Sequence, residues 1–411
     1  MKPVSATGRR TPGPVTSPAR LAPWRFWATA YTMLALLTGP NLPTPLYRGY
    51  AERFGFSPLT LTLIFAAYVA VLIPSLLVAG PLADAVGSRA VILPAVVLAA
   101  LGSLSFGLAD GTAWLFAGRI LQGLAIGSAS GALTAALSAL EPQGRRHRAA
   151  LVSTAVSMSG LGLGPLLAGL LAQYGPSPSF LPFGVEIVLL GPAAVLAVTA
   201  LPGAHSRTRW RPRRPQIPAP MRAVFATASA PAFLAFAVMG LFLTLIPTYA
   251  GELARSGNLS LAGGAVALML ACSVLAQLGG YGRPGRTLQL RGLPLLAAGL
   301  ALLAATHVVS SLPLLLAAAA AAGAGQGLVF LGGLTAVNQH APAQRHADVL
   351  SSFYVVIYLG VGVPVVGVGF LATVIGLLPV VQWFAAVTAL ISVAALTILA
   401  RPGRRDRREA P

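Results

Sequence analysis

The sequence is poor in charged residues, and acidic residues are scarcest. Only 9% of the 411 residues are charged, nine of them acidic, whereas 56% are hydrophobic and the mean hydropathy is +0.79. A globular domain carries about 25% charged residues because its surface must stay hydrated. The shortage of charge therefore excludes a soluble globular protein, and we expect most of the chain to contact lipid.

Cysteine is almost absent as well. Cys272 is the only one, which excludes a disulfide scaffold, and the high apolar content excludes a disordered chain. The net charge of +19 comes from 28 basic residues, all Arg except Lys2. These lie in short gaps between apolar runs rather than on one surface of a folded domain, so no nucleic-acid partner is expected.

Twelve apolar runs are long enough for a helix to cross a bilayer, which takes about 20 residues. The predicted spans are 26–46, 59–79, 90–109, 113–139, 149–172, 181–201, 228–249, 261–280, 292–309, 312–338, 349–375 and 377–400. The sequence thus predicts an all-α polytopic membrane protein. Its predicted parts are a basic tail (1–25), a six-helix bundle (26–201), a linker (202–227), a second six-helix bundle (228–400) and a second basic tail (401–411).

The basic residues predict the orientation in the membrane. With the N-terminus inside, 24 of them fall in inner loops and tails, while Arg48, Arg53 and Arg255 fall outside and Arg119 lies within a span. By the positive-inside rule, both termini are expected in the cytoplasm of a cell (plasma or inner) membrane protein. Residues 1–22 have no apolar core followed by a cleavage site, so they are predicted to be a cytosolic tail rather than a signal peptide.

The two predicted bundles repeat one another. Gln122-Gly123-Leu124 is followed by Pro142 and Pro165, and Gln326-Gly327-Leu328 is followed by Pro342 and Pro364, with separations of 23 and 22 residues between the prolines. Duplicated bundles around a site at the membrane midplane are the architecture of alternating-access transporters.

One loop carries a family resemblance. The segment from Gly80 to Arg89, Gly-Pro-Leu-Ala-Asp-Ala-Val-Gly-Ser-Arg, resembles the loop 2–3 signature of the major facilitator superfamily, although Ala85 and Ser88 replace residues that are often basic there. The resemblance implies a cytoplasmic latch formed by Gly80, Asp84, Gly87 and Arg89 that stabilises the outward-facing state. The alternative is a solvated turn with a topogenic arginine.

Two further motifs strengthen the resemblance. Arg119-Ile-Leu-Gln-Gly is similar to the helix 4 signature of proton-coupled members, and Gly160, Gly164, Pro165 and Gly169 resemble the helix 5 signature of the twelve-helix drug/proton antiporters. An arginine within a span costs about 2.5–3.5 kcal/mol and normally faces a partner or a cavity. Snorkelling of Arg119 to the outer headgroups is the alternative.

Glu186 is the one carboxylate well inside a predicted span. Such a group is a proton-carrier candidate, and its depth allows a pair with Arg119, although an interfacial position is equally compatible with the sequence. Proline breaks around Asn41 expose backbone carbonyls where a substrate could bind. The candidate residues of the substrate pathway are Asn41, Gln122, Gln277, Gln326, Tyr354 and Tyr358.

These patterns together predict a monomeric secondary transporter that exports small, partly apolar compounds in exchange for protons. The alternative is a proton-coupled importer of a small metabolite. A membrane enzyme is disfavoured because no catalytic motif is present. No metal site is predicted, and an ion gradient takes the place of a cofactor.

Overall fold

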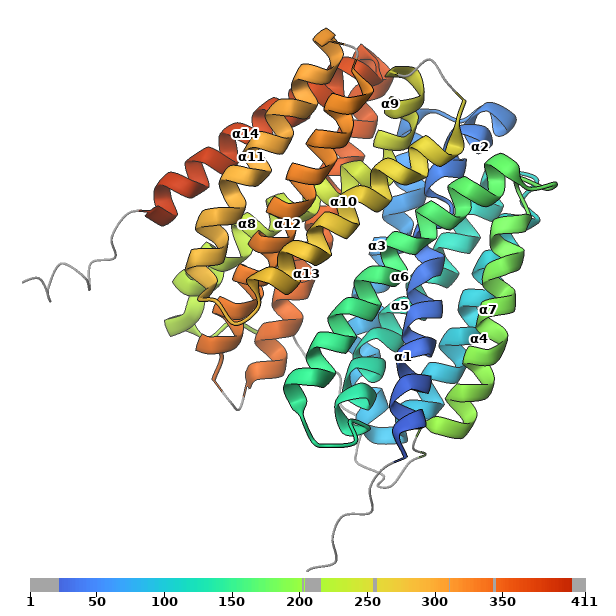
Figure 1. Cartoon of the computed structure of the whole chain (residues 1–411), viewed down its shortest axis with the longest axis vertical. Helices are drawn as coiled ribbons and strands as arrows, with labels where there is room; N and C mark the ends of the chain where they lie inside the picture. The colour runs from blue at the N-terminus through green and yellow to red at the C-terminus, as the bar shows by residue number, and fades with distance from the viewer. Residues whose placement is uncertain are drawn as a thin grey trace, which may run out of the picture.

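The computed structural model describes residues 22–201, 203, 216–253, 257–309, 311–342 and 345–400. Both predicted tails, apart from residues 22–25, and most of the linker lie outside these residues. All regular structure among them is helical, which confirms the predicted all-α class. The chain folds as two lobes, with α1 to α7 in one and α8 to α14 in the other (Figure 1).

The N-terminal half contains seven helices. They are α1 (Pro23–Thr38), α2 (Tyr47–Phe54), α3 (Pro58–Val86), α4 (Ser88–Gly107), α5 (Thr112–Ala139), α6 (Arg146–Tyr174) and α7 (Leu181–Ala200).

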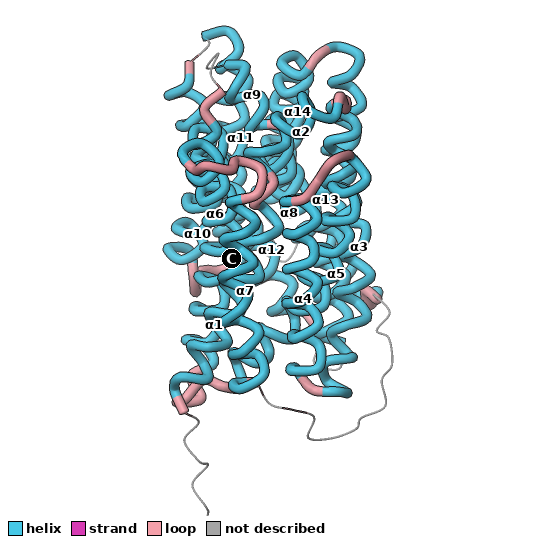
Figure 2. Tube along the Cα trace, turned by 90° about the vertical axis from the view of Figure 1, so that its right-hand side faces the viewer, coloured by secondary structure: helices cyan, strands magenta, loops and turns pink. Residues whose placement is uncertain are grey.

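The C-terminal half repeats this order. Its helices are α8 (Arg222–Thr244), α9 (Ile246–Leu253), α10 (Leu259–Gly280), α11 (Gly285–Val309), α12 (Leu312–His340), α13 (His346–Ile375) and α14 (Leu377–Ala400). Most of the helices run along the long axis of the molecule (Figure 2).

Eleven helices among the described residues are long and apolar enough to span a membrane. The predicted first span is not among these eleven, because α1 has only 16 residues, after which two short 3-10 turns over 39–46 lead into α2. Residues 222–227, expected in the linker, form the first turns of α8 instead, because the prolines of the linker end at Pro220.

Local sequence sets the start of several helices in the same way in both halves. Ser57 Oγ accepts the backbone N–H of Thr60 before α3, and Asn258 Oδ1 accepts those of Ser260 and Leu261 before α10. These caps satisfy N–H groups that the first turn of a helix leaves unpaired.

The short helices α2 and α9 occupy equivalent places in the two halves. Each carries a tyrosine that makes an equivalent hydrogen bond, a repeat that the sequence motifs do not show. Tyr50 of α2 donates its hydroxyl hydrogen bond to the carbonyl of Phe106 at the end of α4, at 2.8 Å. Tyr249 of α9 hydrogen-bonds Thr306 at the end of α11, at 2.5 Å. Each half therefore ties its first membrane-crossing segment to its third with a tyrosine.

Glycines set the close contacts inside each half. A side chain on Gly123 or Gly127 of α5 would overlap the backbone of α3, and one on Gly327 of α12 would overlap the backbone of α10. Small residues allow such approach between helices in a membrane. Gly131 continues the spacing of Gly123 and Gly127, but nothing lies near it.

Two helix pairs make most of the contact between the halves, α3 with α13 and α6 with α10. The second and fifth spans are α3 and α6 in the N-terminal half and α10 and α13 in the C-terminal half. A twofold rotation that superimposes the halves therefore maps the α3–α13 pair onto the α10–α6 pair. The halves are thus related by a pseudo-twofold axis, as the repeat predicts.

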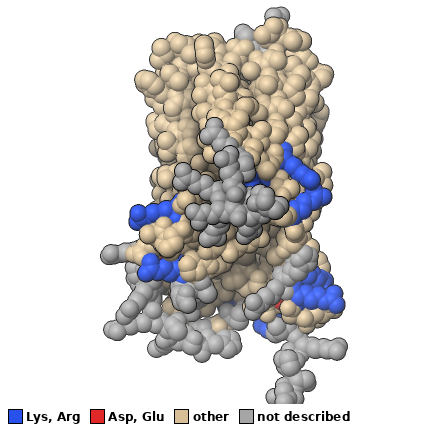
Figure 3. All heavy atoms as spheres, turned by 90° about the vertical axis from the view of Figure 1, so that its left-hand side faces the viewer, with Lys and Arg blue, Asp and Glu red and all other residues tan. Residues whose placement is uncertain are grey.

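We call the end of the molecule at which α1 and α8 begin the basic end, and the opposite end, which carries α2 and α9, the distal end. Among the described arginines, only Arg48 and Arg53 lie at the distal end. On the face shown in Figure 3, Lys and Arg gather in the lower part, and the upper part shows none.

The contacts between α6 and α10 close the distal end. The backbone N–H of Leu259 donates to Gln173 Oε1 at 2.8 Å, and Ser260 Oγ donates to the carbonyl of Gly169 at 3.3 Å. A side chain on Gly263 would overlap the carbonyl of Pro165. The absence of a Cβ at position 263 therefore permits the closed distal end.

This contact gives the first prediction. Gly263→Leu should open the distal end, because its side chain cannot fit against Pro165. Gly264→Leu is the matched control, since nothing lies within 4 Å of a Cβ on Gly264. Spin labels on cysteines introduced at Tyr174 and Gly257, in a Cys272→Ser background, should report longer distances for Gly263→Leu only. Equal distances in both variants would show that this glycine does not control closure.

Candidate functional site

The break in α1 organises the candidate site. Pro40, Pro43 and Pro45 lack backbone N–H groups, so several carbonyls before them lose their helical donors. As predicted from the prolines, the helix gives way to 3-10 turns from Gly39 onward.

Two carbonyls of the break accept hydrogen bonds from side chains of α5, and that of Gly39 also accepts the backbone N–H of Leu42 at 3.1 Å. Gln122 Nε2 donates to the carbonyl of Gly39 at 3.2 Å, and Arg119 Nη1 donates to the carbonyl of Pro40. Gln122 Oε1 in turn accepts from Arg119 Nη1 at 3.0 Å. The break therefore binds protein side chains where the sequence suggested that a substrate could bind.

Arg119 is completely buried, so it does not snorkel to an interface. Its Nε donates to the hydroxyl of Tyr47 at 2.6 Å. Four aromatic rings surround the guanidinium with centroids 5.4–5.7 Å from Cζ, a distance at which cation–π attraction operates; they belong to Tyr47, Phe65, Tyr68 and Phe106. Its Nη2 has no hydrogen-bond partner among the described residues.

Glu186 of α7 is 1% exposed, so its side chain lies inside the protein. Ser103 of α4 donates its hydroxyl hydrogen bond to Oε2, whereas Oε1 has no partner among the described residues. The carboxylate packs directly against Gly39, where any side chain would overlap it. Glu186 thus contacts the break in α1 directly.

The suggested pair between Arg119 and Glu186 is not formed. Within the described part of the chain, the two ion pairs are Arg48–Glu52 and Arg148–Glu141. Arg119 and Glu186 instead approach adjacent residues of the break, Pro40 and Gly39. The structure therefore places a buried guanidinium and a buried carboxyl group on one backbone segment without joining them.

Asn41 has a structural partner. Its Nδ2 donates to the carbonyl of Leu161 in α6 at 3.0 Å. Leu161 lies four residues before Pro165, and Pro165 has no N–H to offer that carbonyl. Asn41 therefore supplies the hydrogen bond that Pro165 removes, and it connects the break in α1 to the proline of α6.

The residues of the helix 5 motif, which lie on α6, contact two different helices. Side chains on Gly160 or Gly164 would overlap the backbone of α1, in the same half. Pro165 and Gly169 face α10 of the other half, at Gly263 and Leu259. One helix thus packs tightly on the break in α1 and on the distal contact between the halves.

The candidates of the second half form two separate groups. Ser273 Oγ donates to Gln326 Oε1 at 2.6 Å and accepts from Gln277 Nε2 at 3.1 Å. Tyr354 and Tyr358 stack with ring centroids 6.4 Å apart and are half-buried on α13. Gln326 is thus hydrogen-bonded across helices and Gln277 within α10, whereas the two tyrosines present partly open aromatic surface.

The predicted latch is described in part. Gly87 forms the turn between α3 and α4 with φ 90°, a value that favours glycine, and its N–H donates to the carbonyl of Ala83 at 2.9 Å. Arg89 is exposed in the first turn of α4. The surroundings of Gly80 and of the Asp84 side chain are not described, so the latch stays a prediction.

Glu141 fixes the neighbouring turn between α5 and α6. Its carboxylate accepts the backbone N–H groups of Arg145 and Gln143 at 2.6 and 2.9 Å, and Arg148 lies 3.3 Å away. Burial alone would raise the pKa of Glu141, but these hydrogen bonds and the charges of Arg145 and Arg148 outweigh it and hold the pKa below its usual value.

Sequence reasoning missed Tyr47 and Ser103. Tyr47 follows the proline-rich break directly, and Ser103 has no motif around it. A search for polar residues at the depth of Arg119 and Glu186 would have found Ser103, but not its orientation.

A profile of the family described as Major Facilitator Superfamily matches residues 26–308. The chain belongs to this superfamily. It is therefore a transporter of this family rather than an enzyme.

Relatives and solved structures agree with this assignment. Multidrug resistance proteins named MdtD from Escherichia coli (strain 536) and Cronobacter sakazakii are 28% identical over 188 residues and 29% over 175 residues. These matches cover 45% and 42% of this chain, and only 39% and 37% of the relatives.

Two solved superfamily-like folds cover most of the chain. A bacterial homologue of the human lysosomal transporter Spinster, in an inward-facing and unoccupied conformation, gives a TM-score of 0.69 at 13% identity, over 92% of this chain and 95% of its own. A mutant of the nucleoside transporter NupG gives 0.71 at 11% identity, over 92% and 100%. At such identities the likeness shows the fold alone.

The contact between Asn41 and Leu161 gives the second prediction. Asn41→Leu should lower the free energy of unfolding by about 1 kcal/mol, because a buried carbonyl loses its donor. In a Pro165→Ala background the same change should cost less, since the substituted alanine restores the helical N–H. Thermal or denaturant unfolding of the four proteins measures the coupling. Additive effects would show that Asn41 does not compensate for Pro165.

Proposed function

We propose that this superfamily member is a proton-coupled transporter that exports small, partly apolar compounds. The observation that carries the proposal is the buried carboxylate of Glu186, which has one oxygen without a partner among the described residues and packs on the break in α1.

Proton binding by Glu186 has a physical basis in its surroundings. An ionised carboxylate inside a membrane is costly unless it is paired. Ser103 donates one hydrogen bond, and no cation is within ion-pairing distance among the described residues. Protonation removes the charge, and release of the proton restores it, so the carboxyl can carry one proton per transport cycle.

Arg119 has a supporting role in this cycle. Its position is fixed by Tyr47 and by the carbonyl of Pro40. A buried positive charge close to the break stabilises the ionised form of Glu186 when the proton leaves. Arg119 Nη2 and Glu186 Oε1 both lack partners among the described residues, and a shift of the segment 39–40 that joined them would satisfy both atoms.

The direction of transport and the cargo rest on separate observations. The helix 5 motif is similar to that of antiporters, and the MdtD relatives are named for multidrug resistance. Tyr354 and Tyr358 offer partly open aromatic surface beside the contact between α3 and α13. Such surface suits compounds that are partly apolar.

Alternating access would proceed by rocking of the two halves. The distal end is closed through α6 and α10. We propose that the basic end is cytoplasmic, in accord with its arginines, and that the chain spans the cell membrane. The latch residues Asp84 and Arg89 would then stabilise the opposite, outward-facing state.

Transport in liposomes tests the proposal and gives the third prediction. With an imposed pH gradient, the purified protein should move partly apolar dyes, ethidium among them, against the direction of proton flow. Glu186→Gln should reduce this movement to background, because the amide cannot carry a proton. Glu52→Gln, an exposed carboxylate at the distal end, is the matched control and should keep wild-type transport.

Two results would contradict the proposal. Proton-driven transport that survives Glu186→Gln would remove this residue from coupling. Movement of dyes or metabolites only in the same direction as protons would identify an importer.

A further inference from the structure

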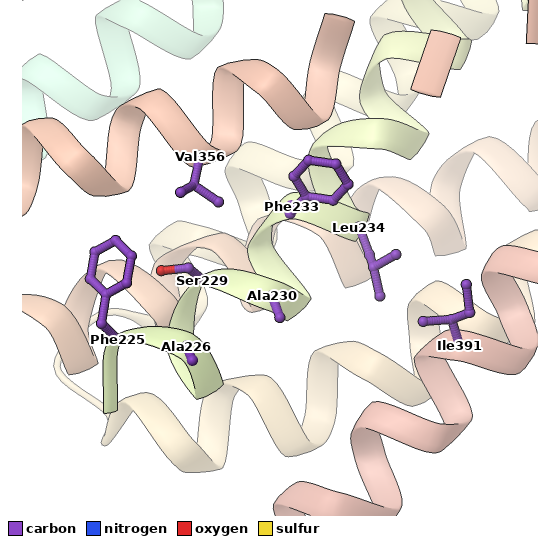
Figure 4. A pocket seen from close by; sticks show the side chains of 8 residues that line it. All are labelled: Phe225, Ala226, Ser229, Ala230, Phe233, Leu234, Val356 and Ile391. Atoms are coloured by element: carbon purple, nitrogen blue, oxygen red, sulfur yellow. The ribbon is translucent and has the colours of Figure 1, made fainter. Parts of the chain in front are cut away.

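A crevice between α8 and α14 is not used by the proposed transport cycle. A cavity of about 460 Å³ is lined by residues of α8, α13 and α14, including Phe233, Leu234, Val356 and Ile391 (Figure 4). Ser229 is the one polar residue in its lining. The N-terminal half contributes no lining residue, so the cavity lies away from the contact between the halves.

The depth of this cavity matches the acyl chains of one leaflet. Its residues on α8 lie up to 12 residues beyond Arg222, or roughly 18 Å at 1.5 Å per residue. Ile391 lies nine residues before the end of α14, or roughly 14 Å. One leaflet of the hydrocarbon core is about 15 Å thick.

A second cavity lies nearer the basic end of the same two helices. It measures about 250 Å³, and its lining includes Thr227, Arg286, Gln289 and Ile398. Ile398 and Ile391 are seven residues apart and therefore lie on one face of α14. The deeper cavity is apolar except for Ser229, and the shallower one adds the polar side chains of Thr227, Arg286 and Gln289 to an apolar lining.

Two arginines mark the basic end of the crevice. Arg286 donates from Nε and Nη2 to the carbonyl of Leu399, at 3.3 and 3.0 Å, which holds its guanidinium beside the end of α14. Arg222 begins α8, one turn before the lining residues Phe225 and Ala226. Guanidinium groups recognise phosphate oxygens through charge and paired N–H donors.

We propose that this crevice binds an anionic phospholipid. One acyl chain lies in the apolar cavity, and the headgroup phosphate lies at Arg286 and Arg222. The surrounding surface of α14 faces lipid, with Trp383 and Leu390 67% and 70% exposed. A lipid therefore reaches the site from the bilayer directly, and the site is independent of proton coupling.

Native mass spectrometry of the full-length protein in detergent gives the fourth prediction. The probes are dioleoyl phosphatidylglycerol and dioleoyl phosphatidylcholine, which share chains but differ in net charge. Wild-type protein should prefer phosphatidylglycerol. Arg222→Gln with Arg286→Gln should reduce that preference by roughly 25-fold, at about fivefold for each arginine.

A second variant tests the apolar cavity. Ala230 lines it and is exposed, so Ala230→Trp should fill it and weaken binding of both lipids without disturbing the fold. Ala226→Trp serves the same purpose if Ala230→Trp does not fold. The matched controls are Val195→Trp on the exposed surface of α7 and Arg48→Gln with Arg53→Gln at the distal end; these should bind both lipids as wild type does.

Three outcomes would overturn the proposal. They are an unchanged preference in the double arginine variant, unchanged binding in the tryptophan variants, and equal losses in the controls. Displacement of phosphatidylglycerol by ethidium with unchanged headgroup preference in the arginine variant would instead identify the crevice as a site for cargo.

Discussion

The constraint on which the N-terminal half depends is the loss of backbone hydrogen bonds at the proline-rich break in α1. Inside a membrane, water cannot satisfy the carbonyls that the prolines release, so other protein groups must do so. Gln122 and Arg119 of α5 bind the carbonyls of Gly39 and Pro40. The free-energy cost of burying Arg119 in the span is thus offset in part because its guanidinium donates to a backbone carbonyl of the break. Glu186 packs on the same segment.

The same principle connects the break to the distal contact. Pro165 releases the carbonyl of Leu161, and Asn41 supplies the missing donor. Since Pro165 and Gly169 also face α10, α6 contacts both the break in α1 and the C-terminal half. A change in charge at Glu186 that moves Gly39 would therefore act on a helix that closes the distal end. These contacts form a continuous chain from Glu186 to the distal end, and such a chain can couple the charge of Glu186 to closure of that end.

The two halves share a plan but differ in charge. Gln122 of α5 reaches Gly39 of α1, and the equivalent Gln326 of α12 lies 3.9 Å from Met239 Sδ of α8. Where the N-terminal half has Arg119, the C-terminal half has Gly323, which packs on the backbone of α10. Among the described residues, the buried charged side chains are thus confined to one half, and the other half offers neutral polar and aromatic groups. This division supports separate places for the proton and the cargo.

The sequence was sufficient for features set by local chemistry. Apolar length predicted the spans, prolines predicted a break around Asn41, and the repeated Gln-Gly-Leu predicted the duplication. It was insufficient where helix rotation decides the contact. Arg119 and Glu186 have similar depth, but their rotation directs them to different atoms of the break rather than to each other. The role of Asn41 was predictable in principle, because Leu161 precedes Pro165 by four residues, but its partner required the packing of α1 on α6.

Reversible protonation of Glu186 is the central claim, and infrared spectroscopy of the purified protein tests it most directly. The carboxyl stretch of Glu186 is assigned by its loss in Glu186→Gln. If Glu186 carries the proton, this signal changes from the protonated to the ionised form as the buffer pH is raised, and it changes back when the pH is returned. A signal that stays in one form at every pH at which the protein is folded would contradict the account.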